Sequence, residues 1–137
     1  MDIAEIISGP QFTFYAIVDD NRCYVEEFVT NLEKKDLKQL LNSYEKIVTI
    51  GLSHNEEKFR GIGGKIFELK TRRGVRLLGF FAGSSLPKSI ILTHGFFKPH
   101  NRILIRERDK AVKWRKEFFK SSDINIIDRT EEGSREL

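Results

Sequence analysis

Residues 65–98 read KIFELKTRRGVRLLGFFAGSSLPKSIILTHGFFK. This stretch contains three apolar runs that are rich in β-branched and aromatic residues, and each has the length of one strand. The runs occupy 66–70, 75–81 and 89–97. Residues 71–74 and 82–85, which separate them, contain the Gly and Ser that favour turns. The stretch therefore predicts a three-stranded antiparallel meander, which the rest of the chain is expected to support.

Positive charge is concentrated in and after this meander. Residues 61–120 contain 15 Lys or Arg and 4 Asp or Glu, whereas residues 1–60 contain 7 and 11, and residues 121–137 contain 2 and 5. A block of one sign on a sheet and an adjoining helix produces a field that attracts polyanions. We interpret the block as a nucleic-acid surface; solubilising cations, or a patch for an acidic protein partner, are the alternatives.

Length and composition predict one folded domain. A chain of 137 residues that is 39% hydrophobic can bury a core of its own. We assign residues 1–120 to this domain. The acidic, polar tail at 121–137 is expected to be disordered or to add a short strand at 124–127.

Several features favour the cytoplasm and argue against a membrane partner. The only cysteine, Cys23, cannot form an intramolecular disulfide, which suits a reducing compartment. No apolar run approaches the roughly 20 residues that span a bilayer. The first residues, MDIAEIISGP, are acidic where a signal peptide would be basic. No His, Cys and Asp cluster has the spacing of metal ligands, so neither a metal nor another cofactor is expected.

The segments around the meander complete an α+β pattern. Residues 1–7 suggest a short helix, and residues 11–18 alternate as a strand. Residues 24–48 repeat apolar side chains at helical spacing in two runs, which predicts an antiparallel helical pair on one face of the sheet. Residues 53–64 show neither period and are interpreted as a surface loop. Residues 104–120 predict a helix with a basic face.

Three short motifs follow one another along the meander. They are Phe67-Glu68-Leu69-Lys70, then Val75-Arg76-Leu77 with Phe80-Phe81, then Ile91-Leu92-Thr93-His94-Gly95-Phe96-Phe97-Lys98. Their order and spacing, with Ala111 before further basic residues, resemble the phage-derived HigB-like branch of the RelE/ParE toxin superfamily across residues 11–119. The resemblance implies a RelE-like α+β fold in the order β-α-α-β-β-β-α. In that fold the sheet core is antiparallel, the helical pair covers one face, and the C-terminal helix is basic.

The resemblance also implies a function. Such a protein is the toxin of a type II toxin–antitoxin pair, which enters the ribosomal A site, contacts rRNA and cleaves mRNA. Its expected protein partner is a cognate antitoxin that resembles a helix-turn-helix repressor and covers the basic cleft. A ParE-like gyrase inhibitor and a non-catalytic RNA-binding module are the alternative functions.

The chemistry of RNA cleavage indicates candidate catalytic residues. Attack by a 2′-hydroxyl requires its deprotonation, stabilisation of a dianionic phosphorane and protonation of the 5′-oxygen. Cations can supply the electrostatic stabilisation without a metal. A three-residue loop at 72–74 would place Lys70 opposite Arg76. We therefore expect Lys70, Arg76 and Lys98 to hold the phosphate.

The role of His94 stays open between proton transfer and a hydrogen-bonded structural histidine. Glu68 is interpreted as a carboxylate that ties a neighbouring cation. Further residues are expected to contact RNA through stacking or through its backbone. They are Arg72, Arg73, Phe96, Phe97 and Arg102. For each of these cations, the alternative is a solvated surface charge.

Overall fold

The computed structural model describes residues 1–52, 59–98 and 101–129, and only the backbone of 101–103. These ranges hold seven strands, three α-helices and one 3₁₀ turn. The strands are β1 (Asp2–Ser8), β2 (Thr13–Val18), β3 (Phe59–Gly63), β4 (Ile66–Lys70), β5 (Val75–Phe81), β6 (Ser89–Phe97) and β7 (Asn125–Ile127). The helices are α1 (Tyr24–Thr30), α2 (Lys34–Ile50) and α3 (Asn101–Lys120), and the turn is η1 (Gly83–Ser85). The protein is therefore α+β.

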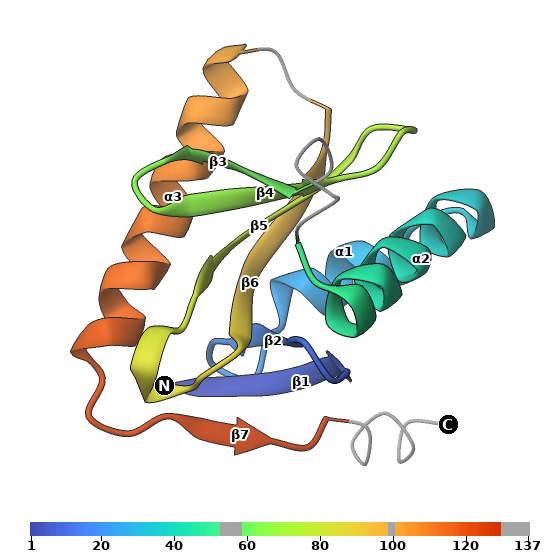
Figure 1. The fold of residues 1–137 in the computed structure, drawn as a ribbon. Helices are drawn as coiled ribbons and strands as arrows, with labels where there is room; N and C mark the ends of the chain where they lie inside the picture. The colour runs from blue at the N-terminus through green and yellow to red at the C-terminus, as the bar shows by residue number, and fades with distance from the viewer. Residues whose placement is uncertain (53–58, 99–100, 130–137) are drawn as a thin grey trace.

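All seven strands belong to one mixed sheet (Figure 1), in the order β3-β4-β5-β6-β2-β1-β7. The three strands of the predicted meander pair antiparallel and begin and end at the predicted residues. The expectation of an antiparallel sheet core is wrong in two places, because β2 pairs parallel to β6 and β1 pairs parallel to β7. The chain reaches β6 after a long excursion from β2, and such a crossover allows parallel pairing.

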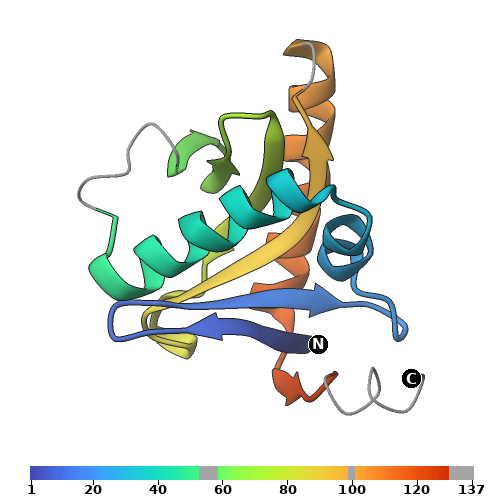
Figure 2. The same cartoon turned by 90° about the vertical axis from the view of Figure 1, so that its right-hand side faces the viewer.

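The helices cover the two faces of this sheet (Figures 1 and 2). α1 and α2 lie on one face and α3 lies on the other, so the predicted helical pair on one face is confirmed. Each side has its own apolar core. The side of α1 and α2 includes Phe14, Leu40, Tyr44, Leu69 and Leu77. The side of α3 includes Ile17, Leu78, Phe80, Ala111 and Phe118.

Helix α3 follows β6 and begins earlier than residues 104–120 predict. It runs for 20 residues, and its buried Ala111 and Phe118 face the sheet. Most of its cations lie on the solvent side, which gives the helix the predicted basic face. Across the part of the chain that the structure describes, we find no helix with the length and apolarity needed to traverse a membrane.

Two segments that were expected to lack strands form them. Residues 1–7 were predicted to be helical, but β1 pairs antiparallel with β2, from Asp2 opposite Val18 to Ser8 opposite Thr13. The predicted loop at 53–64 contains β3, which pairs with β4; residues 53–58 lie outside the described ranges. In both cases pairing with a neighbouring strand satisfies the backbone groups and overrides a weak local pattern.

The tail also differs from the expectation of disorder. β7 pairs with β1 over three residues, Asp2 to Ala4 opposite Asn125 to Ile127, so the short-strand alternative is confirmed. Figure 1 shows β7 along the outer edge of the sheet, beside β1. Residues 130–137 lie outside the described ranges. The strand was hard to predict because its partner, β1, is distant in sequence, and no residue near 121–129 indicates this pairing.

Close packing between β5 and β6 generates the first prediction. A Cβ added at Gly79 would lie 2.6 Å from the Ile91 carbonyl oxygen, which is backbone and cannot move aside cheaply. A Cβ added at Gly61 would meet nothing closer than 3.7 Å. We expect Gly79→Ala to lower the free energy of unfolding by about 1–3 kcal/mol. Urea denaturation followed by circular dichroism measures this change, with Gly61→Ala as the matched control; equal effects of the two substitutions would contradict the packing argument.

Candidate nucleic-acid interface

The β4–β5 hairpin sets the geometry of the predicted phosphate-binding residues. The Thr71 amide donates to the Val75 carbonyl at 3.0 Å, and the Val75 amide donates to the Thr71 hydroxyl at 3.2 Å. Gly74 takes a φ of 105°, which favours glycine. The loop thus has three residues, and Lys70 lies opposite Arg76, as predicted.

This pair continues across the sheet to β6. Arg76 lies opposite Phe96, and the row faces α3, because the alternate residues Leu69 and Leu77 belong to the core under α1 and α2. Lys98 follows β6, and its amide donates to the Gly74 carbonyl at 2.6 Å. The backbone positions of Lys70, Arg76 and Lys98 therefore meet around one hairpin. We call these three residues the cation row.

Within the cation row, Arg76 is held firmly by its neighbours. Its Nη1 donates to the carbonyl oxygens of Thr71, at 3.3 Å, and Val75, at 3.1 Å. Its Nε lies 3.6 Å from Glu68 Oε2, and the Arg76 side chain is only 12% exposed. The structure therefore places Arg76 as an ordered cation whose charge Glu68 offsets.

Glu68 does tie neighbouring cations, in agreement with its interpretation. Glu68 lies on β4, two residues before Lys70, the residue opposite Arg76. It is 1% exposed. Its Oε1 accepts a hydrogen bond from Arg60 Nε at 3.3 Å. Burial of a carboxylate costs several kcal/mol of desolvation unless cations accompany it, and the two arginines offset this cost for Glu68.

The two lysines of the row differ from Arg76. Among the residues that the structure describes, neither Lys70 nor Lys98 forms an ion pair or a side-chain hydrogen bond. Lys98 is exposed and Lys70 is half-buried. Their ammonium groups are thus available to an anion from outside.

His94 is bonded through both ring nitrogens. Thr93 Oγ1 lies 2.8 Å from Nδ1, and Glu107 Oε2 of α3 lies 2.6 Å from Nε2. The Thr93 hydroxyl also lies 3.3 Å from the Leu78 carbonyl oxygen, so its single proton has two possible acceptors. A neutral ring satisfies both of its contacts when that proton is donated to the closer Nδ1 and Nε2–H donates to Glu107. Burial lowers the pKa of His94, while the Glu107 carboxylate opposes this effect. The arrangement is that of a structural histidine, which joins β6 to α3.

Of the other residues predicted to contact RNA, some are held by contacts within the protein and others are exposed to solvent. Arg73 donates to Asp36 Oδ1 at 2.8 Å and thus ties the hairpin to the first turn of α2. Arg72 is exposed, and its side chain forms no ion pair or hydrogen bond with the described residues. Phe97 packs edge-on against Phe28 with ring centroids 5.3 Å apart, although it remains 54% exposed. Arg102 lies in α3, with its side chain outside the described part.

Sequence reasoning missed a hollow beside the cation row. It has a volume of about 490 Å³ and lies between β6, the start of α1 and α3. Its walls are formed by Tyr24, His94, Gly95, Phe96, Glu107, Lys110 and Trp114. The spacing of Glu107, Lys110 and Trp114 on one helical face could have indicated part of this hollow. Tyr24 could not be included, because α1 is far from these residues in sequence.

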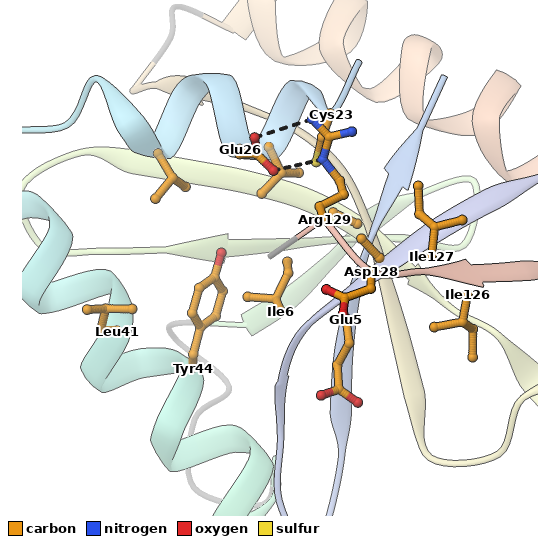
Figure 3. A pocket seen from close by; sticks show the side chains of 14 residues that line it. Glu5, Ile6, Cys23, Glu26, Leu41, Tyr44, Ile126, Ile127, Asp128 and Arg129 are labelled. Atoms are coloured by element: carbon orange, nitrogen blue, oxygen red, sulfur yellow. Dashed lines mark hydrogen bonds and ion pairs between the residues drawn. The ribbon is translucent and has the colours of Figure 1, made fainter. Parts of the chain in front are cut away.

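A larger hollow, of about 680 Å³, lies on the opposite face between α1, α2, β1 and β7 (Figure 3). Its walls are mostly apolar, and the ion pair between Arg129 and Glu26 spans its rim at 2.9 Å. Tyr44 lines it, and the Tyr44 hydroxyl is buried without a hydrogen-bond partner among the described residues. None of the predicted site residues lies there.

Within the described ranges, no three His, Cys, Asp or Glu side chains are grouped as metal ligands. No protein-family model matches this chain. No curated protein matches its sequence either. The cation row and the neighbouring hollow are therefore the features that any functional proposal has to explain.

The buried pair of Glu68 and Arg76 generates a stability prediction. We expect Arg76→Met to lower the free energy of unfolding by about 3 kcal/mol, because it leaves the buried carboxylate with Arg60 alone. The double variant Glu68→Gln/Arg76→Met should recover part of this loss. Urea denaturation of the single and double variants measures both effects; a double variant less stable than Arg76→Met would contradict the pairing.

The contacts of His94 generate a pH prediction. Because folding lowers the pKa of His94, the unfolded chain takes up the proton first as the pH falls. The stability contributed by neutral His94 is therefore present at pH 7 and is lost as the pH falls below about 6.5. We expect the His94 midpoint in an NMR titration to lie below 6.5, and lower still in Glu107→Gln, which removes the opposing carboxylate. A midpoint that rises in Glu107→Gln would contradict this account.

Proposed function

We propose that this protein is the toxin of a type II toxin–antitoxin pair and cleaves mRNA in the ribosomal A site. The observation that carries the proposal is the cation row. Two lysines without partners among the described residues flank an ordered arginine at one hairpin. A phosphate in this position would meet two lysine ammonium groups and the ordered guanidinium of Arg76, whose charge Glu68 offsets, within a segment whose net charge is strongly positive.

The arrangement of the fold supports a RelE-like protein. Two helices on one face precede the meander of β4, β5 and β6, and a basic helix follows it. Strands β1, β3 and β7 extend this pattern at both edges of the sheet. The meander carries the motifs on which the resemblance depends, and it also carries the cation row.

Each residue of the row has a distinct part in the proposed reaction. Arg76, fixed by Glu68 and two carbonyl groups, offers its remaining N–H donors to a non-bridging phosphate oxygen. Lys70 and Lys98 stabilise the charge that develops as the 2′-oxygen bonds to phosphorus and the bond from phosphorus to the 5′-oxygen breaks. The 2′-hydroxyl proton passes to water, and a lysine ammonium group protonates the leaving 5′-oxygen. The reaction uses no metal, because these cations supply the electrostatic stabilisation. His94 positions α3 against β6, and its ring is committed to Thr93 and Glu107.

The proposed partners follow from the same surface. Arg72 and the basic face of α3 would contact the phosphate backbones of rRNA and mRNA. A cognate antitoxin of the helix-turn-helix class, through an acidic or amphipathic segment, would cover the cation row and prevent cleavage.

Substitution of the two lysines tests the proposal. We expect Lys70→Ala/Lys98→Ala to reduce cleavage at least about 100-fold, because it removes cations that stabilise the transition state. The folded state should be retained, since neither side chain has a partner among the described residues. The measurement is the appearance of new 5′ ends on cellular transcripts in the first minutes after induction from a tightly repressed promoter.

The control is Lys46→Ala, which removes an exposed lysine of α2 and should leave cleavage unchanged. New 5′ ends that are in frame and confined to translated regions support the ribosome-dependent nuclease. Growth arrest with intact transcripts and broken DNA would point instead to gyrase inhibition. Absence of growth arrest, with salt-sensitive RNA binding, would point to a non-catalytic RNA-binding module.

A further inference from the structure

The hollow of about 490 Å³ lies where the sheet opens. β2 pairs with β6 only as far as Ala16 opposite Leu92. From Thr93 onward, the side of β6 that faces away from β5 has no neighbouring strand among the described residues. The hollow occupies this position, with α1 on one side and α3 on the other.

The walls of the hollow are aromatic. Tyr24 and Trp114 lie with ring centroids 6.5 Å apart, and His94 and Phe96 lie 5.9 Å apart. All four side chains are partly exposed, so their ring faces are not fully covered by the protein. Aromatic faces arranged around a basic surface are typical of sites that stack unpaired RNA bases.

The polar group of the hollow is the Glu107 carboxylate. Its Oε2 accepts from His94 Nε2 at 2.6 Å, and its Oε1 accepts from Lys110 Nζ at 3.1 Å. Each carboxylate oxygen has a second lone pair, and the Glu107 side chain is 13% exposed. The contacts with His94 and Lys110 hold the carboxylate as an acceptor that is fixed in place but not saturated.

A fixed carboxylate selects among the four bases. Guanine presents two adjacent donors, N1–H and the 2-amino group, on its Watson–Crick edge, and a carboxylate can accept both. Adenine and cytosine present an amino group beside a ring acceptor, and uracil presents one N–H between two carbonyl groups. The lone pairs on these ring nitrogens and carbonyl oxygens would face the carboxylate oxygens and repel them, so the site disfavours adenine, cytosine and uracil.

We propose that this hollow binds an unpaired guanine of RNA, stacked on the aromatic side chains, with Glu107 accepting from its Watson–Crick edge. The exposed ammonium group of Lys110 at the rim contacts the phosphate of that nucleotide. The inference rests on the proposed function in one respect. Phe96 belongs to both the hollow and the row of Arg76, so the bound guanine would lie next to the phosphate that is cleaved.

The sequence contains one tryptophan, Trp114, so quenching of its fluorescence reports on the hollow directly. The probes are 2′-O-methyl RNA pentamers, UUXUU, in which X is guanine, hypoxanthine, adenine or uracil. They lack the 2′-hydroxyl and cannot be cleaved by its attack. We expect the guanine pentamer to bind at least about tenfold more tightly than the hypoxanthine pentamer, which lacks only the 2-amino group.

Variants separate the two parts of the site. Glu107→Gln should abolish the guanine preference, whereas Glu45→Gln, an exposed carboxylate of α2, should leave it unchanged. Tyr24→Leu should weaken all four pentamers alike, because it removes a stacking surface and leaves Glu107 in place. The comparison of guanine with hypoxanthine in the unaltered chain needs no variant, so a poorly folded Glu107→Gln protein does not decide the outcome.

Equal binding of all pentamers, no quenching by any of them, or a guanine preference that persists in folded Glu107→Gln would each overturn the inference. The assay is independent of cleavage. If cells show no transcript cleavage while the guanine preference persists, the nuclease proposal fails and the guanine site stands. If transcripts are cleaved without a guanine preference, the nuclease proposal stands and this inference fails.

Discussion

The buried carboxylate of Glu68 is the constraint on which the basic surface depends. A carboxylate that is 1% exposed on β4, the second strand from one edge of the sheet, requires cations close by, and the fold supplies Arg76 from β5 and Arg60 from β3. Desolvation is offset only in good geometry, so the pair fixes the guanidinium of Arg76. A cation that could otherwise move freely at a strand surface is thereby ordered before any ligand binds, which reduces the entropic cost of binding an anion.

The fold neutralises some of its positive charges and leaves others available. Arg73 is consumed in binding the hairpin to α2, and Arg76 is balanced by Glu68. Lys70 and Lys98, on either side of Arg76, have no carboxylate partner in the part of the chain that the structure describes. The number of cations in a sequence is therefore larger than the number available to bind an anionic ligand. The relevant quantity is the set of cations that the folded structure leaves without carboxylate partners. Among the described residues around this hairpin, that set is Lys70, Arg72 and Lys98.

The three strands of the meander and the register of β4 with β5 could be predicted from the sequence, because they depend on local features. Strand lengths follow from apolar runs, and a three-residue loop fixes Lys70 opposite Arg76. The parallel pairing of β1 with β7 could not be predicted, since its partners are separated by more than a hundred residues. Two contacts of the site could not be predicted for the same reason. Arg73 meets Asp36 from another element, and His94 meets Glu107 only after α3 folds back on the sheet.

The same topology separates stability from recognition along the sheet. At one end β1 pairs with both β2 and β7, and the buried side chains of Ile3, Phe14 and Ile17 form a closed core there. At the other end β6 continues beyond Leu92 without a neighbour on the side of β2, and α1, α3 and the β4–β5 hairpin surround it. Polar and aromatic side chains line this end, because no strand of the described part packs beside β6 on that side and the side chains there need not belong to the apolar core. Substitution of the exposed side chains at that end, such as Lys98, therefore changes charge and shape at the surface, whereas the buried pair of Glu68 and Arg76 also contributes to stability.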